Sequence, residues 1–367
     1  MFRNYQFKNI NYRLIIAVIL LTTIGILVIG SANADYQNRQ ITGLILGMVV
    51  LTFFTLFDFE ILLQFHWYFY GLTIGLLLAV LLFGDDSKGA TRWRDIGIRF
   101  QPSEIGKIFL VLFFAWFLTT KSEELNKRKT ILELLLFAGI PLLLILKEPD
   151  LSTTIVTFMV IVSVVYCAGL SRKIFLPILL VVIPLIIIYL MVTYQTKTTP
   201  FLSEYQGVRI LAWMFPNDYP GSSYQQQNSI MAIGSGQLLG KGLNNNNFDS
   251  VKNGNYISEP QTDFIFAVAG EEIGFVGAAI IIVLLLIIVL ECLYTSKKAK
   301  SLAGELICIG IACIIGYQSF VNICVVTGLM PNTGLTLPFV SYGLTSLVTL
   351  YMGIGIVLNV GLQAKKY

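Results

Sequence analysis

Apolar stretches long enough to cross a lipid bilayer recur along almost the whole chain. A helix of roughly 20 residues spans the hydrocarbon core of a membrane, because each residue adds about 1.5 Å to its length. Only 13% of the residues are charged, about half the usual share in soluble domains. The sequence therefore predicts an all-α polytopic membrane protein, with one integral-membrane domain over residues 1–367. The ten expected transmembrane helices lie approximately at 14–32, 41–57, 61–83, 105–120, 131–147, 152–170, 174–194, 264–293, 302–327 and 335–362.

The positions of lysine and arginine predict how these spans are oriented. Short cytoplasmic loops of membrane proteins carry an excess of both residues. Here basic residues gather at the N-terminus, in alternate short loops and at the C-terminus, namely around Arg13, at 121–129, 172–173, 297–300 and 365–366. We therefore expect both termini in the cytoplasm, and a large extracytoplasmic loop, about 195–263, between the seventh and eighth spans.

The outer loop 84–104 is basic although it lies on the side where basic residues are usually scarce. It contains Arg92, Arg94 and Arg99. Guanidinium groups suit phosphate because their planar donors can bind two oxygens at once. Trp93 can anchor the same loop at the membrane interface. The loop is a candidate anion site in which Arg92 and Trp93 would contact the substrate.

Two charged residues follow at the start of the fourth span. Pro102 suits the first turn of a helix, and Glu104 and Lys107 then lie three residues apart on one helix face. They can form a local ion pair that hides two charges at the membrane edge. Alternatively, Lys107 belongs to the anion site of the preceding loop, with Glu104 beside it.

The segment 259–277 carries the carboxylates that most need an explanation. Asp263 stands where the long polar loop becomes an apolar helix, and Glu271 and Glu272 lie within the apolar run. Ionisable groups at such positions are costly and are functional candidates by default. For Asp263 the alternative is a helix N-cap, a position that aspartate fills well.

Further candidates lie in the remaining outer segments. Asp150 can cap the span that follows Pro149, but capping does not explain Glu148, which could pair with an outer arginine. Arg209 and Lys241 are the cations of the large loop.

The glycines around Lys241 do not form a phosphate-binding loop. Position 235 is Ser where that motif requires Gly, and Gly242 replaces the required Ser or Thr. They are more typical of a re-entrant turn at the membrane surface. In the last span, Ser341 belongs to a polar helix face that could bind substrate or serve helix packing.

The cysteines, the net charge and the single histidine suggest no additional sites. The five cysteines lie in apolar segments and do not have the spacing of metal ligands. We expect them to be buried and to pack as small apolar side chains, as free cysteines usually do. The net charge of +4 comes from short loops between helices, so no nucleic-acid partner is expected. His66, the only histidine, lies among aromatic residues and is expected to be structural.

Several blocks of sequence resemble the SEDS family, which comprises RodA, FtsW and SpoVE proteins of bacterial elongation, division and sporulation. The short termini favour a RodA-like member. The family's SYGGSS block reads SYGLTS here, and SEP precedes the TDF block in place of a proline-first PE, which bears on subfamily more than on activity. The similar blocks, in family order, are GATRW (89–93), FQPSEIGK (100–107), EPDLSTT (148–154), the YQ…AIGSG…GKG series (224–242), TDFIFAVAGEEIGFVG (262–277) and PNTGLTLPFVSYG (331–343).

The resemblance implies a peptidoglycan glycosyltransferase of the bacterial plasma membrane that polymerises lipid II on the outer face. Asp263 matches the family's essential carboxylate and would act as general base in an inverting transfer, with undecaprenyl diphosphate as leaving group. The substrate-binding candidates are Arg92, Trp93, Glu104, Lys107, Glu148, Arg209, Lys241, Glu272 and Ser341.

The resemblance also implies partners, chiefly lipid II, membrane lipids and a class B penicillin-binding protein that cross-links the strands. A divalent cation, Mg or Mn, is possible, with Asp263 and Glu104 as ligands. Two other functions remain open. A flippase or transporter of lipid-linked precursors would also use buried carboxylates, and a scaffold for the transpeptidase would need no carboxylate chemistry.

Overall fold

The structure is a computed structural model that describes residues 5–83, 85–87, 90–95, 99–200, 202–244, 250, 254 and 256–363, with the backbone alone for those between 85 and 100 and for Leu179. In this part of the chain, nine helices are long and apolar enough to cross a membrane, and a tenth apolar helix, Leu151–Cys167, is shorter. The predicted class, an all-α polytopic membrane protein, is confirmed.

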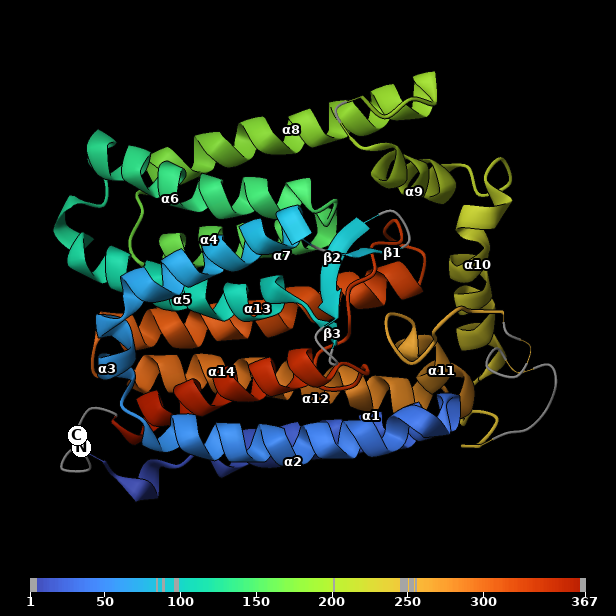
Figure 1. Cartoon of the computed structure of the whole chain (residues 1–367), viewed down its shortest axis with the longest axis horizontal. Helices are drawn as coiled ribbons and strands as arrows, with labels where there is room; N and C mark the ends of the chain where they lie inside the picture. Colours follow the sequence, from blue (N-terminus) through green and yellow to red (C-terminus); the bar gives the residue numbers. More distant parts are fainter. Residues whose placement is uncertain are drawn as a thin grey trace.

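The ten apolar helices run side by side as one bundle (Figure 1). They are α1 (Tyr12–Ala32), α2 (Ala34–Leu56), α4 (His66–Phe83), α5 (Pro102–Thr120), α6 (Arg128–Lys147), α7 (Leu151–Cys167), α8 (Arg172–Thr196), α12 (Gly274–Lys298), α13 (Leu302–Val326) and α14 (Leu344–Leu362). The shorter helices are η2 (Phe7–Asn9), α3 (Phe59–Gln64), η3 (Ser122–Glu124), α9 (Glu204–Met214), α10 (Pro220–Ser235) and α11 (Ile265–Glu272).

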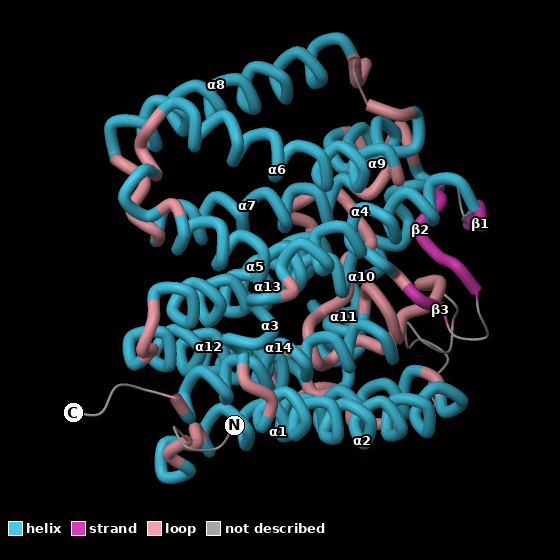
Figure 2. The backbone as a smooth tube through the Cα atoms, turned by 60° about the vertical axis from the view of Figure 1, so that its left-hand side comes forward, coloured by secondary structure: helices cyan, strands magenta, loops and turns pink. Residues whose placement is uncertain are grey.

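The two ends of the bundle differ. Both chain termini lie at one end, which we call the terminal end, and α9, α10 and α11 lie at the other, the loop end (Figures 1 and 2). The loop end also holds a small antiparallel sheet in the order β1 (Asp85–Ser87), β2 (Ala90–Asp95) and β3 (Arg99–Phe100). The hydropathy pattern did not predict these strands, because they are short and belong to a charged loop.

Helices α5, α13 and α14 form the centre of the bundle. In each of them, 72% to 78% of the most apolar stretch is buried inside the protein. Helix α13 contacts α5, α7, α12 and α14. In α8, by contrast, none of the most apolar stretch is buried, as expected for a helix that faces lipid.

Three predicted spans differ clearly from the structure. The span expected at 61–83 is two helices, α3 and α4, which are separated at Phe65. The span expected at 264–293 is also two helices, α11 and α12, which are separated at Ile273. Gly274 has a φ of 65°, a conformation that suits glycine and interrupts an α-helix. The span expected at 335–362 begins only at Leu344. Pro338 lacks an amide hydrogen for a helix, and Phe339 has a left-handed φ of 64°.

The glycine-rich segment after α10 turns tightly against the break between α11 and α12. Lys241 and Gly242 donate their backbone N–H groups to the carbonyls of Glu271 and Glu272, at 2.9 Å each. Gly240 has a φ of 81°, and a Cβ atom there would lie 2.2 Å from the Glu272 carbonyl oxygen. These glycines therefore allow two backbone segments to approach closely, as the sequence pattern indicated.

Close helix packing also gives a stability prediction. A Cβ atom on Gly355 of α14 would lie 2.7 Å from the Leu51 carbonyl oxygen of α2, whereas one on Gly75 of α4 would meet nothing within 4 Å. Replacing a helical glycine by alanine otherwise favours the helix, by about 0.5–1 kcal/mol. Gly355→Ala should therefore lower the thermal unfolding temperature of the purified protein, and Gly75→Ala should leave it unchanged or raise it. Equal unfolding temperatures for the two variants would contradict this account of the α2–α14 contact.

Candidate functional site

A buried ion pair lies on α5, near the loop end of the bundle. Because α5 begins at Pro102, Glu104 and Lys107 lie on its first two turns. Lys107 Nζ is 2.8 Å from Glu104 Oε1, and the two side chains are 2% and 6% exposed. The predicted local pair is therefore confirmed, and Ser346 Oγ of α14 donates to Glu104 Oε2 at 3.2 Å.

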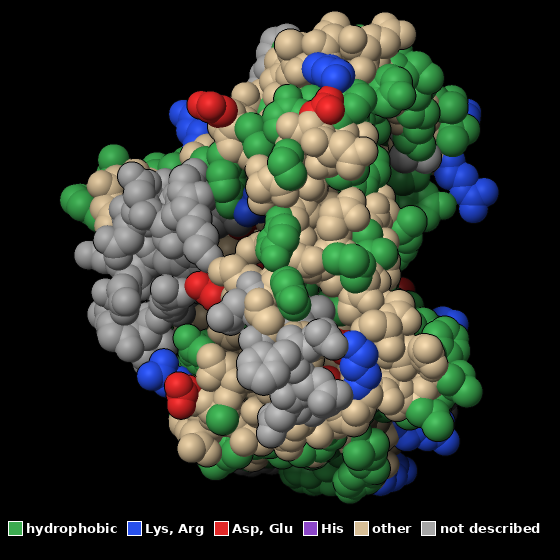
Figure 3. Space-filling view, turned by 90° about the vertical axis from the view of Figure 1, so that its right-hand side faces the viewer, with side chains coloured by type: hydrophobic (Ala, Val, Ile, Leu, Met, Phe, Trp, Pro, Cys, Tyr) green, Lys and Arg blue, Asp and Glu red, His purple; other side chains and the backbone are tan. Residues whose placement is uncertain are grey.

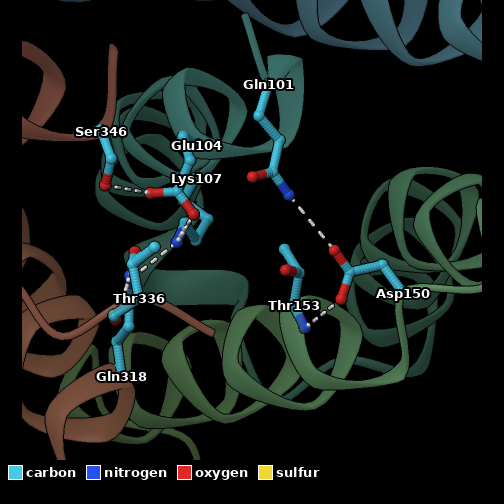
Figure 4. Close-up of polar contacts among 8 residues, drawn as sticks. All are labelled: Gln101, Glu104, Lys107, Asp150, Thr153, Gln318, Thr336 and Ser346. Atoms are coloured by element: carbon cyan, nitrogen blue, oxygen red, sulfur yellow. Dashed lines mark hydrogen bonds and ion pairs between the residues drawn. The ribbon is translucent and has the colours of Figure 1, made fainter. Parts of the chain in front are cut away.

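The side-chain amide of Gln318, on α13, forms a hydrogen bond with this ion pair. Lys107 Nζ also donates to Gln318 Oε1 at 2.8 Å. The Gln318 amide donates in turn to the backbone oxygen and the hydroxyl of Thr336, at 3.1 and 3.2 Å. Figure 4 shows these contacts converging from α5, α13, α14 and the loop before α14. One buried network thus connects four segments that are far apart in the sequence.

A second amide on α13 holds the backbone at Asp263. Asn322 lies one turn after Gln318 and is 1% exposed. Its Nδ2 donates to the Asp263 carbonyl at 2.8 Å and to the Leu335 carbonyl at 2.6 Å. Tyr342 N donates to the Gln261 carbonyl at 2.8 Å. The turn that carries Asp263 is therefore held against the loop between α13 and α14.

Asp263 itself is partly buried and precedes the first residue of α11 by two positions. The N-cap of α11 is Phe264, whose side chain makes no capping hydrogen bond. Asp263 is therefore not the N-cap residue of α11. A carboxylate that is partly exposed and held on a constrained turn is suited to take up a proton from a bound hydroxyl.

Asp150 has the structural role that the sequence indicated. Its Oδ1 accepts from Thr153 N at 3.0 Å at the start of α7, and its Oδ2 accepts from Gln101 at 3.3 Å (Figure 4). Glu148, two residues before Asp150, is the C-cap residue of α6 and is 1% exposed. Together they place a buried acidic turn beside the start of α5.

Arg209 lines a groove at this end of the molecule. The groove has a volume of about 760 Å³ and lies between α9, α10 and the loop at Asn332. The guanidinium group stacks 4.3 Å from the centre of the Tyr205 ring and donates to the Tyr205 hydroxyl and, at 3.4 Å, to the Asn332 carbonyl. Its aromatic and backbone contacts fix the guanidinium at the groove wall.

Three further predicted substrate-binding residues, Lys241, Glu272 and Ser341, contact other parts of the protein. Lys241 Nζ is 2.7 Å from Glu271 Oε1, and Ser31 donates to Glu272 at 2.6 Å. Both glutamates end α11, an eight-residue helix, so they lie roughly 12 Å along the helix from its start near Asp263. Ser341 Oγ accepts from Leu337 N at 2.7 Å and so stabilises its own loop.

The side chains of Arg92 and Trp93 lie outside the described part of the chain, although β2 carries both positions. Figure 3 views the loop end directly and shows Lys, Arg, Asp and Glu side chains spread among apolar ones. The residues missed at the sequence level are Gln318 and Asn322. Two amides four residues apart in an otherwise apolar span were the available signal, because buried polar groups need partners.

A model of the cell cycle protein family FtsW, RodA and SpoVE matches residues 12–366. The chain is 31% identical to a probable peptidoglycan glycosyltransferase FtsW of Geobacter sulfurreducens, over 96% of this chain and 95% of that one. It is 34% identical to the peptidoglycan glycosyltransferase MrdB of Escherichia coli, over 96% and 93%.

Two solved structures have the same fold. The chain is similar to a protein of a peptidoglycan synthase complex that coordinates polymerization and crosslinking, with a TM-score of 0.78, 27% identity, and coverage of 96% and 97%. It is also similar to the rod shape determining protein RodA of Thermus thermophilus, with a TM-score of 0.69, 25% identity and 98% coverage of both chains.

The buried ion pair gives a second stability prediction. Removing one partner of a buried pair leaves an uncompensated charge and costs about 3–5 kcal/mol. Lys107→Met and Glu104→Gln should each lower the unfolding temperature strongly. The decrease in the double variant should be much smaller than the sum of the two single decreases. The control is the exposed pair of Glu124 and Lys127, which has the same spacing and a distance of 2.7 Å.

Lys127→Met should change the unfolding temperature little, because exposed pairs are screened by water. Additive losses at Glu104 and Lys107 would show that the two side chains do not stabilise each other.

Proposed function

Because the chain belongs to the FtsW, RodA and SpoVE family of cell cycle proteins, we infer that it is a peptidoglycan glycosyltransferase. Relatives that cover almost the whole chain carry this activity in their names. The protein is a multi-pass membrane protein. We propose that it polymerises lipid II into glycan strands on the outer face of the bacterial plasma membrane.

The observation that carries the mechanism is the constrained, partly buried Asp263 beside α11. We propose Asp263 as the general base. It takes the proton of the acceptor's 4-hydroxyl while that oxygen attacks the anomeric carbon of the donor. The bond from the anomeric carbon to the diphosphate oxygen breaks, the configuration inverts, and undecaprenyl diphosphate leaves. A positioned base of this kind typically contributes about 10²–10⁴-fold to the rate.

The negative charge that develops on the leaving diphosphate needs a cation. Arg209 lines the groove between α9 and α10, where its guanidinium contacts Tyr205 and the Asn332 carbonyl. Its position at an open groove, and a planar donor group that can bind two phosphate oxygens, support a role for Arg209 in binding the diphosphate. Lys107, Lys241 and Arg92 are further candidates.

A divalent cation stays a prediction. Among the described residues, no three His, Cys, Asp or Glu side chains cluster as metal ligands would. Both carboxylate oxygens of Glu104 have contacts in the protein, to Lys107 and Ser346. This donor set does not fit the predicted pair of Asp263 and Glu104 as metal ligands, so no step is assigned to a metal.

The orientation and the partner are also proposals. The basic loops support a cytoplasmic location for the terminal end of the bundle, where both termini lie (Figure 1). The loop end, with Asp263 and the groove, then faces outward, where lipid II would be polymerised. A class B penicillin-binding protein is the expected partner, and the similarity to a protein of a peptidoglycan synthase complex supports it.

A flippase or transporter is the alternative function. Carriers of this kind usually bind substrate near the membrane midplane, between repeated halves and broken helices. Here Asp263, Arg209 and the groove belong to the loop end (Figure 1). This one-sided arrangement favours chemistry at a membrane surface over transport.

The first functional prediction concerns Asp263. Asp263→Asn keeps the size of the side chain and removes its capacity to accept a proton. We expect polymer formation from lipid II by the purified protein, with its transpeptidase partner present, to fall by at least about 10²-fold. The control is Asp218→Asn, which removes an exposed carboxylate that pairs with Lys197 at 2.6 Å. Full polymerisation by Asp263→Asn would exclude Asp263 as the base.

The second functional prediction concerns Arg209. Arg209→Lys keeps the charge but loses the planar, two-pronged donor. We expect its KM for lipid II to rise more than its kcat falls, if the guanidinium holds the diphosphate in the ground state as well as in the transition state. Steady-state polymerisation rates over a range of lipid II concentrations measure both constants. Unchanged constants would remove Arg209 from the substrate site.

A further inference from the structure

A second polar pocket lies at the terminal end of the bundle, far from Asp263. It has a volume of about 360 Å³ and lies where the segment before α1 meets the end of α12. Three cations line it, Lys8, Arg13 and Lys298, together with one carboxylate, Glu291. The pocket is therefore positively charged, and the glycosyl transfer proposed above does not use it.

The single carboxylate is held by neighbouring protein groups. Asn11 Nδ2 donates to Glu291 Oε2 at 2.9 Å, and Arg13 Nη1 lies 3.9 Å from Glu291 Oε1. The Arg13 side chain is 85% exposed, whereas that of Glu291 is 15% exposed. Glu291 thus positions the base of the pocket, while most of the Arg13 guanidinium stays accessible to an anion.

Aromatic residues stand beside these cations. Lys298 Nζ lies 4.1 Å from the centre of the Tyr294 ring. Tyr294 is 52% exposed and Tyr12 is 62% exposed. Exposed tyrosines next to lysine and arginine at the end of a membrane span are typical of the lipid headgroup region. The pocket therefore lies at the level of the membrane where phosphates of lipids are found.

Apolar surface continues from the pocket into the membrane. On α1, Ile16 and Leu20 are exposed by 56% and 49%, and they follow Arg13 at helical spacing. On α12, Leu290 and Leu286 are exposed by 53% and 54%, and they precede Tyr294 on the same face. Arg13 and Tyr294 both line the pocket, and α1 and α12 pack against each other, so both exposed apolar rows, which we call the apolar strip, begin at the pocket. A phosphate group in the pocket would have its acyl chains beside this strip.

We propose that this pocket binds the headgroup of an anionic phospholipid, with the phosphate contacted by Lys8, Arg13 and Lys298. Basic pockets between transmembrane helices bind such headgroups on the cytoplasmic side. The apolar strip is what distinguishes a lipid from a free phosphate ion, because only the lipid gains contacts there. The site is independent of the glycosyltransferase reaction, and with the proposed orientation it lies in the inner leaflet.

The test measures binding of phosphatidylglycerol to the full chain in a neutral detergent, by titration followed with native mass spectrometry. Phosphatidylcholine, whose zwitterionic headgroup has no net charge, is the comparison lipid. The variant is Lys8→Gln with Arg13→Gln and Lys298→Gln. Each basic residue contributes roughly fivefold to the affinity for an anionic headgroup, so the triple variant should bind about a hundredfold more weakly. The single variant Lys298→Gln should show an intermediate loss.

A matched control removes three exposed basic residues of the same bundle end, Arg128, Lys129 and Lys173, each replaced by Gln. It should retain the wild-type affinity. Unfolding temperatures in phosphatidylcholine verify that all variants are folded. Equal losses in the two triple variants would overturn the proposal, because binding would then reflect overall charge. Displacement of the lipid by inorganic phosphate at equal concentration would also overturn it, since the pocket would then bind the ion alone.

Discussion

The packing at the centre of this bundle depends on the hydrogen bonds of the Gln318 side-chain amide. A charged group inside an apolar bundle is costly unless other groups neutralise it and satisfy its hydrogen bonds. Glu104 neutralises the charge of Lys107, and the side-chain oxygen of Gln318 accepts a second hydrogen bond from the Lys107 ammonium group. The same amide donates to Thr336, so the cation and the loop before α14 are held by one side chain. The network explains how α5 can carry two charges in its buried part.

Irregular backbone within a membrane protein is tolerated where the protein itself satisfies its polar groups. Asn322 provides this for two such segments at once, because its Nδ2 donates to carbonyls of both the turn at Asp263 and the loop at Leu335. Gln40 adds a third contact by donating to the Ser341 carbonyl at 3.1 Å. The loop between α13 and α14 therefore acts as the support for the turn that carries the proposed base.

Hydropathy predicted the number and approximate limits of the apolar helices, because burial in lipid imposes a long, uninterrupted apolar run. It did not predict the break between α11 and α12, because the break depends on the left-handed backbone conformation of Gly274, which hydropathy does not report. The pairing of Glu104 with Lys107 was accessible from their spacing alone. The roles of Gln318 and Asn322 were not, because their partners are distant in the sequence and adjacent only after folding.

The position of Asp263 finally depends on both ends of α11. At its start, Asn322 holds the Asp263 backbone. At its end, Lys241 pairs with Glu271, and Ser31 of α1 donates to Glu272. Since α11 has only eight residues, a shift at the glutamates would be transmitted along the helix to the carboxylate. These contacts give both buried glutamates of the GEE segment a structural role at the end of α11, while substrate binding by Glu272 stays a prediction.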